Sequence, residues 1–117
     1  MGDIRHRAMV VTSWDRERLT AAHTKAAEFL GHLVSPVIES TSNGYVSFFT
    51  APDGSNLGWV ESDFAETSRV AFMTWLDTQR YDDGSSPFAW VEVQYGDEEQ
   101  NTKIVCDSDH RAAVKDT

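Results

Sequence analysis

The sequence predicts a single α+β domain in which two helices pack on one face of a mainly antiparallel sheet. Two stretches, near residues 15–33 and 62–79, carry apolar residues at helical spacing. Short apolar runs of strand length precede, separate and follow these stretches. A chain of 117 residues, of which 40% are hydrophobic, can build one core but not two. Together these observations favour a two-layer architecture.

The N-terminal third predicts one strand and one helix. Residues 6–12 contain the apolar run Ala8–Val11, which has strand length. A helix start follows, because Ser13 or Asp15 can cap the first N–H groups and Trp14 can pack back on Leu19. Gly31 predicts the helix end. The predicted core stripe of this helix is Leu19, Ala22, Ala26, Phe29, Leu30 and Leu33.

Residues 34–41 and 45–51 predict a hairpin. The pair Asn43-Gly44 lies between them and tolerates positive φ at both turn positions. Pro36 has no N–H to donate, so we expect it at the start of its strand or on a sheet edge. The stretch 52–55 then breaks the chain into a turn.

The second helix is expected from a cap at Ser62-Asp63 to about Gln79. The turn-rich residues 82–87 follow it. The predicted core stripe is Phe64, Ala65, Ser68, Ala71, Phe72, Trp75 and Leu76.

Residues 88–95 predict a strand by their alternation, and residues 103–107 predict a short closing strand. Ala89, Val91, Val93 and Tyr95 share one face of the first of these strands, and Phe88, Trp90, Glu92 and Gln94 share the other. The order β-α-β-β-α-β, plus the closing strand, matches the split β-α-β arrangement called ferredoxin-like. We expect one domain over residues 1–107 and a flexible tail over residues 108–117.

The charge is negative and unevenly distributed. The formal net charge is −9, and residues 37–110 carry three positive and fourteen negative side chains. Such a surface repels phosphate backbones, which argues against direct nucleic-acid binding. It suits either a partner with a basic surface or simple solvation.

No pattern of catalytic, metal-binding or cofactor-binding residues emerges. The four histidines lack metal-ligand spacing, and Cys106 predicts a small core or edge residue. Residues 53–56 and 82–85 have the composition of ordinary tight turns. We therefore expect a protein that is not an enzyme. The polar N-terminus, the lack of a long apolar run and the single cysteine predict a cytoplasmic location without a membrane span.

Aromatic residues exceed what one sheet face needs, so some should line the open face or an edge. Trp59, next to Gly58, is the clearest loop candidate. Aromatic rings surrounded by acids are typical of protein interfaces, although a minor core beneath the loops explains them equally well. The candidate partner-binding residues are Asp53, Trp59, Glu61, Asp82, Asp83, Trp90, Asp97, Glu98 and Glu99.

Four segments carry a resemblance over roughly residues 6–107: 13–15, 43–48, 51–55 and 93–97. Together they resemble small uncharacterised proteins encoded by tailed bacteriophages and prophages. The resemblance implies an accessory product that acts inside a bacterial cell, and it assigns no catalytic residues.

The favoured hypothesis is a non-enzymatic acidic phage protein that binds and modulates a host or phage protein. It could act as an inhibitor of a defence system or as a mimic of nucleic acid. One alternative is a small ferredoxin-like ligand-binding domain or enzyme with a pocket near loop 52–60. Another is a virion structural or assembly protein. A homodimer stays open in each case, and no cofactor, nucleic acid or membrane is expected as a partner.

Overall fold

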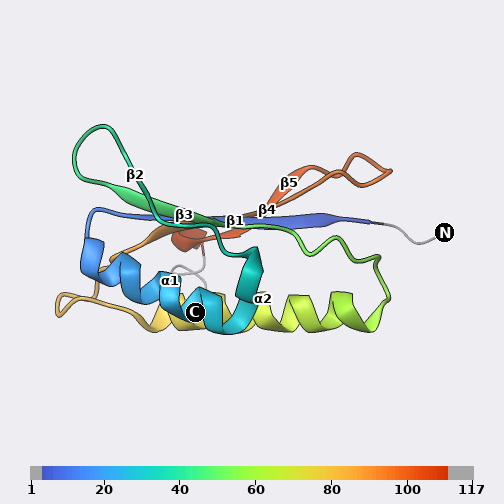
Figure 1. Ribbon diagram of the computed structural model, residues 1–117, viewed down its shortest axis with the longest axis horizontal. Helices are drawn as coiled ribbons and strands as arrows, with labels where there is room; N and C mark the ends of the chain where they lie inside the picture. Colours follow the sequence, from blue (N-terminus) through green and yellow to red (C-terminus); the bar gives the residue numbers. More distant parts are fainter. Residues whose placement is uncertain (1–3, 111–117) are drawn as a thin grey trace.

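The protein is described by a computed structural model over residues 4–110, and it forms two layers (Figure 1). The strands are β1 (His6–Ser13), β2 (Ile38–Glu39), β3 (Val46–Thr50), β4 (Ala89–Tyr95) and β5 (Lys103–Asp107). The helices are α1 (Arg16–Leu30), the short 3-10 helix η1 (Gly31–Leu33) and α2 (Val60–Thr78). Both α-helices lie on the same side of the sheet, as the sequence predicts.

The sheet has five antiparallel strands in the order β2-β3-β1-β4-β5. Strand β1 lies at the centre, with Val10 opposite Phe49 on β3 and opposite Val91 on β4. Residues that pair across strands share a face of the sheet. The register therefore separates a face toward the helices from an open face.

The core lies between the sheet and the two helices. Strand β1 contributes Met9 and Val11, and β3 contributes Val46 and Phe48. The helices and β4 supply the remaining buried apolar side chains, namely Leu19, Ala22, Ala26, Phe72, Met73, Leu76, Phe88 and Trp90. The buried residues, which alternate along the strands and recur at helical spacing along α1 and α2, thus form one core.

The start of α1 follows the sequence prediction in part. Asp15 is the N-cap, and its Oδ1 accepts a hydrogen bond of 3.2 Å from the Arg18 N–H. Trp14, expected to pack on Leu19, is exposed instead, and its ring stacks on Tyr81 with centroids 6.2 Å apart. A residue far along the chain supplies this contact, so local spacing could not reveal it.

The β2–β3 hairpin confirms the predicted turn but not the predicted strand length. Asn43 and Gly44 have φ values of 64° and 69°. Strand β2 covers only Ile38–Glu39, whereas residues 34–41 were expected to be extended and paired. Pro36 interrupts the ladder because it lacks an N–H, and before it Val34 makes an isolated bridge to Thr50.

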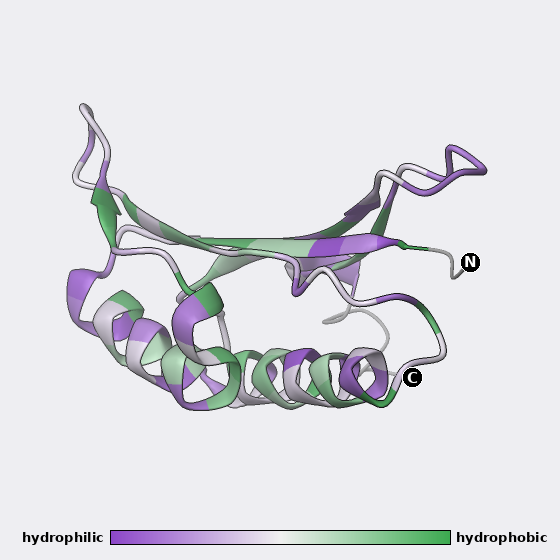
Figure 2. Ribbon diagram, turned by 45° about the vertical axis from the view of Figure 1, so that its right-hand side comes forward, coloured by the Kyte–Doolittle hydropathy of each residue, from purple (hydrophilic) through white to green (hydrophobic). Residues whose placement is uncertain are grey.

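The β2–β3 and β4–β5 loops project from opposite ends of the sheet on the side away from the helices (Figures 1 and 2). Gly96 begins the second loop with φ +80°, and a Cβ there would lie 2.7 Å from Cδ2 of His6. Both observations favour glycine at this position.

At the C-terminal end of the described residues, Ser108–His110 adopt helical conformation, and Asp107 Oδ1 accepts from the His110 N–H. Residues 111–117 of the predicted tail lie outside the described residues, so its flexibility stays a prediction. Within residues 4–110, neither α1 nor α2 combines the length and apolar character needed to cross a membrane.

Candidate functional site

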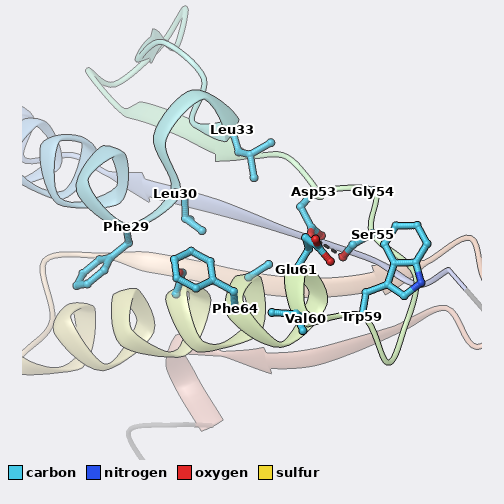
Figure 3. A pocket seen from close by; sticks show the side chains of 12 residues that line it. Phe29, Leu30, Leu33, Asp53, Gly54, Ser55, Trp59, Val60, Glu61 and Phe64 are labelled. Atoms are coloured by element: carbon cyan, nitrogen blue, oxygen red, sulfur yellow. Dashed lines mark hydrogen bonds between the residues drawn. The ribbon is translucent and has the colours of Figure 1, made fainter.

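A groove of about 620 Å³ lies between the C-terminal end of α1 and the N-terminal turns of α2. Loop residues Asp53–Ser55 close it on the sheet side. Figure 3 shows the side chains that line it. They are Phe29, Leu30, Leu33, Asp53, Gly54, Ser55, Trp59, Val60, Glu61, Phe64, Ala65 and Ser68.

The groove exists because the two helices end at different places. Helix α1 stops at Leu30, where Gly31 with φ 58° turns the chain into η1. Helix α2 extends beyond that point, and its N-terminal turns project past α1 (Figure 1). Phe64, expected in the core stripe of α2, is therefore 71% exposed. The helical spacing predicts the correct face of the helix, but among residues 4–110 no other element covers this turn.

Helix α2 begins at Val60, two residues before the predicted cap at Ser62-Asp63. Trp59 is the N-cap residue, with φ −77° and ψ 152°, and its side chain makes no capping hydrogen bond. Its carbonyl oxygen instead accepts from the N–H groups of Ser62 and Asp63 at 3.1 and 3.2 Å. The indole ring is thus left at the rim of the groove, half exposed.

One half of the groove is apolar, and the other holds two carboxylates beside the side chains of Trp59 and Val60 (Figure 3). Phe29, Leu30 and Phe64 occupy the apolar half, while Asp53 and Glu61 gather in the other half. The hydroxyl of Ser55 donates a 2.6 Å hydrogen bond to Asp53 Oδ2. Within residues 4–110, neither Asp53 nor Glu61 forms an ion pair. Their negative charge is available to a cation that enters the groove.

The structure thus brings together three of the nine candidate residues, Asp53, Trp59 and Glu61. The others lie elsewhere. Trp90 is 5% exposed and packs in the core, so its ring does not reach the surface. Strand alternation placed its face correctly, but only the position of the helices shows which face is buried.

Asp97 is also buried. Its Oδ2 lies 3.4 Å from Arg5 Nε, and its Oδ1 accepts a 2.6 Å hydrogen bond from the Asn101 N–H. Asp97 therefore holds the β4–β5 loop together rather than facing a partner. Glu98 and Glu99, which follow it, are exposed near the tip of that loop.

Asp82 and Asp83 lie in the α2–β4 turn, at the end of the molecule opposite to the groove (Figure 1). The hydroxyl and N–H of Ser85 both donate to Asp83 Oδ1, at 2.6 and 2.9 Å. These hydrogen bonds hold the pKa of the Asp83 carboxyl below its ordinary value, and the bond from the Ser85 hydroxyl contributes most. The contacts match the turn chemistry expected from the sequence.

A buried polar cluster beneath α2 was not predicted. Arg69 Nε donates to Glu92 Oε2 at 3.0 Å, and both side chains are almost fully buried. The Cys106 thiol lies 3.5 Å from Glu92 Oε1 and 3.3 Å from the sulfur of Met73. The signal was present in the alternation of residues 88–95, which places Glu92 and Gln94 on the same face as Trp90. Because the charges of Arg69 and Glu92 satisfy each other, we read this cluster as structural.

Other chemistry-bearing residues have structural partners. His23 Nε2 lies 2.8 Å from the carbonyl oxygen of Ser35, and its ring meets Phe48 edge-on. In the part of the chain that the structure describes, no three His, Cys, Asp or Glu side chains cluster closely enough to hold a metal ion.

Comparison with protein-family models, with curated proteins and with solved structures found no match to this chain. A function for the groove can therefore be proposed only from its own chemistry.

Proposed function

We propose that the protein is a non-enzymatic binding module whose groove takes an apolar segment of a partner protein that carries a lysine or arginine. The main support for this proposal is that an exposed apolar surface lies beside two carboxylates, neither of which forms an ion pair within residues 4–110. Apolar side chains of the partner would bury Phe64 and Leu30, and its cation would meet Asp53 and Glu61. An amphipathic helix offers both features on one face.

The charge of the whole chain supports the same kind of partner. With a net charge of −9, the protein attracts basic surfaces over a distance and repels acidic ones. The resemblance to phage-encoded proteins makes a bacterial protein in the cytoplasm the first natural partner to test. Inhibition of a defence system is one outcome that such binding would have.

We favour docking in the groove over mimicry of nucleic acid. A mimic needs its carboxylates spaced along one surface, in the manner of phosphates. Here Asp82 and Asp83 lie at the opposite end of the molecule from Asp53 and Glu61. Asp97 and Glu92 are buried and neutralised by arginines.

We also propose that the fold is the split β-α-β arrangement with an added edge strand. The strand order supports it: α1 connects β1 to β2 with β3 between them, and α2 connects β3 to β4 with β1 between them. Strand β5 extends the sheet beyond β4.

The docking proposal is tested with two synthetic helical peptides, one of leucine and lysine and one of leucine and glutamate. We expect the lysine peptide to bind and the glutamate peptide not to bind, as measured by fluorescence anisotropy of labelled peptide. Phe64→Ser should weaken binding by about tenfold or more, since it removes the burial of one aromatic side chain. The double variant Asp53→Asn/Glu61→Gln should weaken binding about tenfold, at about 0.7 kcal/mol for each exposed charge.

The matched control is Glu98→Gln/Glu99→Gln, which removes the same charge from the β4–β5 loop and should leave the affinity unchanged. Equal binding of the two peptides, or a larger loss in this control than in the groove variant, would contradict the proposal. The same variants then serve as controls when bacterial proteins are screened.

The volume of the groove favours one alternative, a small-ligand site. About 620 Å³ lies within the usual range for such pockets, roughly 300–1,000 Å³. The chemistry would then select an apolar amine. Binding of dodecylamine that is lost in Phe64→Ser, together with no binding of the lysine peptide, would favour this alternative.

A further inference from the structure

The open face of the sheet is uncharged in its three central strands, although the chain as a whole is strongly acidic. The face consists of His6, Ala8, Val10, Thr12, Ser47, Phe49, Ala89, Val91, Val93 and Tyr95, of which Ala8 is itself buried. Ile38 and Ile104 extend it onto the edge strands, and both are exposed, while Asp107 opposite Val91 places one carboxylate on this face at β5. Depletion of charge and enrichment of aromatic and aliphatic residues are typical of the centre of a protein interface.

The register places a projecting ring and a hollow on either side of the central strand. Phe49, Val10 and Val91 form one row across β3, β1 and β4. Phe49 is 39% exposed at one side of Val10. At the other side lies a hollow of about 350 Å³, whose outer wall carries two carboxylates; it is lined by Val10, Thr12, Ala89, Trp90, Val91, Asp107, Ser108 and Asp109.

The projecting ring of one copy can face the hollow of a second copy when a twofold axis relates the two. A twofold axis parallel to β1 and above Val10 places β3 of one copy over β4 of the other. Val10 then faces Val10 of the second copy, and each Phe49 ring faces Val91 and the hollow beside it. Packed sheets usually cross at an angle of about 30°, and a rotation of this size moves residues near the axis only slightly. A twofold contact of this kind uses the same patch on both copies.

The area of the face approaches what a dimer needs. The five strands hold 27 residues, and at about 3.3 Å per residue and about 4.8 Å between strands they cover roughly 430 Å² on each copy, or about 860 Å² for a pair. Stable interfaces begin near 1,000 Å². The two hairpin loops rise beyond the sheet on this side and would add contacts at its ends (Figure 2).

We propose that two copies of this chain associate through their open sheet faces, with Val10 on the twofold axis and Phe49 of each copy in the hollow of the other. The groove between α1 and α2 lies on the opposite side of the sheet and stays accessible. The dimer is therefore independent of what the groove binds.

The test is the mass of the full chain in solution, measured by sedimentation equilibrium over a wide concentration range. The wild-type mass should rise toward twice that of the chain. Val10→Lys should remain monomeric, because two ammonium groups would meet at the axis. Val70→Lys is the matched control: Val70 lies on α2 and is 47% exposed, against 42% for Val10, and its variant should dimerise like wild type.

A second measurement covers the case in which Val10→Lys fails to fold. In a Cys106→Ser background, Phe49→Cys and Val91→Cys chains are mixed and treated with a short bis-maleimide. The mixture should crosslink more than tenfold better than either chain alone, since the axis places residue 49 opposite residue 91. A wild-type mass that stays monomeric throughout, or crosslinking that is equal in the mixture and the single chains, would overturn the proposal.

Discussion

Arg69 and Glu92 bring two opposite charges beneath α2, where little water reaches them. Their side chains are 11% and 2% exposed, and Nε lies 3.0 Å from Oε2. Each charge is tolerated there because the other is present. A buried pair of this kind adds little net stability, but the loss of one partner leaves an uncompensated charge.

We predict that Arg69→Met lowers the free energy of unfolding by about 3–5 kcal/mol, because it leaves the buried Glu92 carboxylate without an opposite charge. The double variant Arg69→Met/Glu92→Leu should recover most of that loss, since it removes both charges. Urea unfolding followed by circular dichroism measures both. The control Arg16→Gln breaks an exposed pair with Glu39 and should cost less than about 1 kcal/mol. A single variant as stable as wild type would contradict the structural reading of this cluster.

Asp15 and Tyr81 join the start of α1 to the α2–β4 turn. The phenol hydroxyl donates to Asp15 Oδ2 at 2.5 Å, and Arg18 lies over the Tyr81 ring. The hydrogen bond from Tyr81 is the main cause that holds the pKa of Asp15 below its ordinary 3.8. The same bond holds the pKa of the Tyr81 phenol above its ordinary value.

We predict that Tyr81→Phe lowers stability at neutral pH and that the difference from wild type disappears in acid. A carboxyl whose pKa is depressed by folding stabilises the fold above pH 3.8, and this contribution is lost as the pH falls through the lower folded value. Urea midpoints of both proteins at neutral pH and at several values below pH 3.8 check this. A difference that stays constant down to the lowest pH would show that the hydrogen bond to Asp15 is not its cause.

At the scale of elements, the N-terminus of α2 connects stability with the groove. Its N-cap position has the extended backbone that a capping side chain needs, but Trp59 cannot accept a hydrogen bond there. Glu61 and Asp63 in the first turn interact favourably with the helix dipole. An aromatic ring thus occupies a position where a cap would be more stabilising, and the ring lines the groove.

We predict that Trp59→Ser is more stable than Trp59→Ala by about 1 kcal/mol, because only serine can cap the helix. Both variants should bind the leucine–lysine peptide more weakly than wild type, since both lose the indole ring. Urea unfolding gives the first quantity and peptide anisotropy the second. Equal stability of the two variants would refute the capping role, and unchanged peptide binding would remove Trp59 from the site.

At the scale of the whole molecule, the layers leave two apolar surfaces on opposite sides of the sheet. The groove is bordered by carboxylates, whereas the open sheet face is uncharged at its centre. Both belong to a chain of net charge −9. The two surfaces should therefore respond to salt in opposite directions.

We predict that raising the salt concentration from about 0.1 M to about 1 M, which shortens the screening length from about 10 Å to about 3 Å, weakens peptide binding in the groove. The same change should strengthen dimerisation, because it screens the repulsion between two acidic copies. Anisotropy and sedimentation at both salt concentrations provide the comparison. A dimer that dissociates in high salt would indicate a contact through charged side chains and not through the open face.

Local chemistry in the sequence determined the cap of α1, the hairpin turn and the periodicity. Asp15 caps α1 and Asn43-Gly44 adopts positive φ, because both properties depend on a few adjacent residues. The five strands, the two long helices and their order follow from spacing in the same way. For the groove, the sequence indicated Asp53, Trp59 and Glu61, since acids and an aromatic residue in a loop are visible without a structure.

Only the tertiary structure decided which of these residues share a surface. Phe64 became part of the groove because α2 extends past α1, and Trp90 became core because the helices cover its face of the sheet. The ring of Phe49 and the hollow beside Val91 lie in one row only because β3, β1 and β4 align in this register. The physical reason is common to all three: exposure depends on packing between elements distant in the chain, whereas periodicity specifies only which residues share a face.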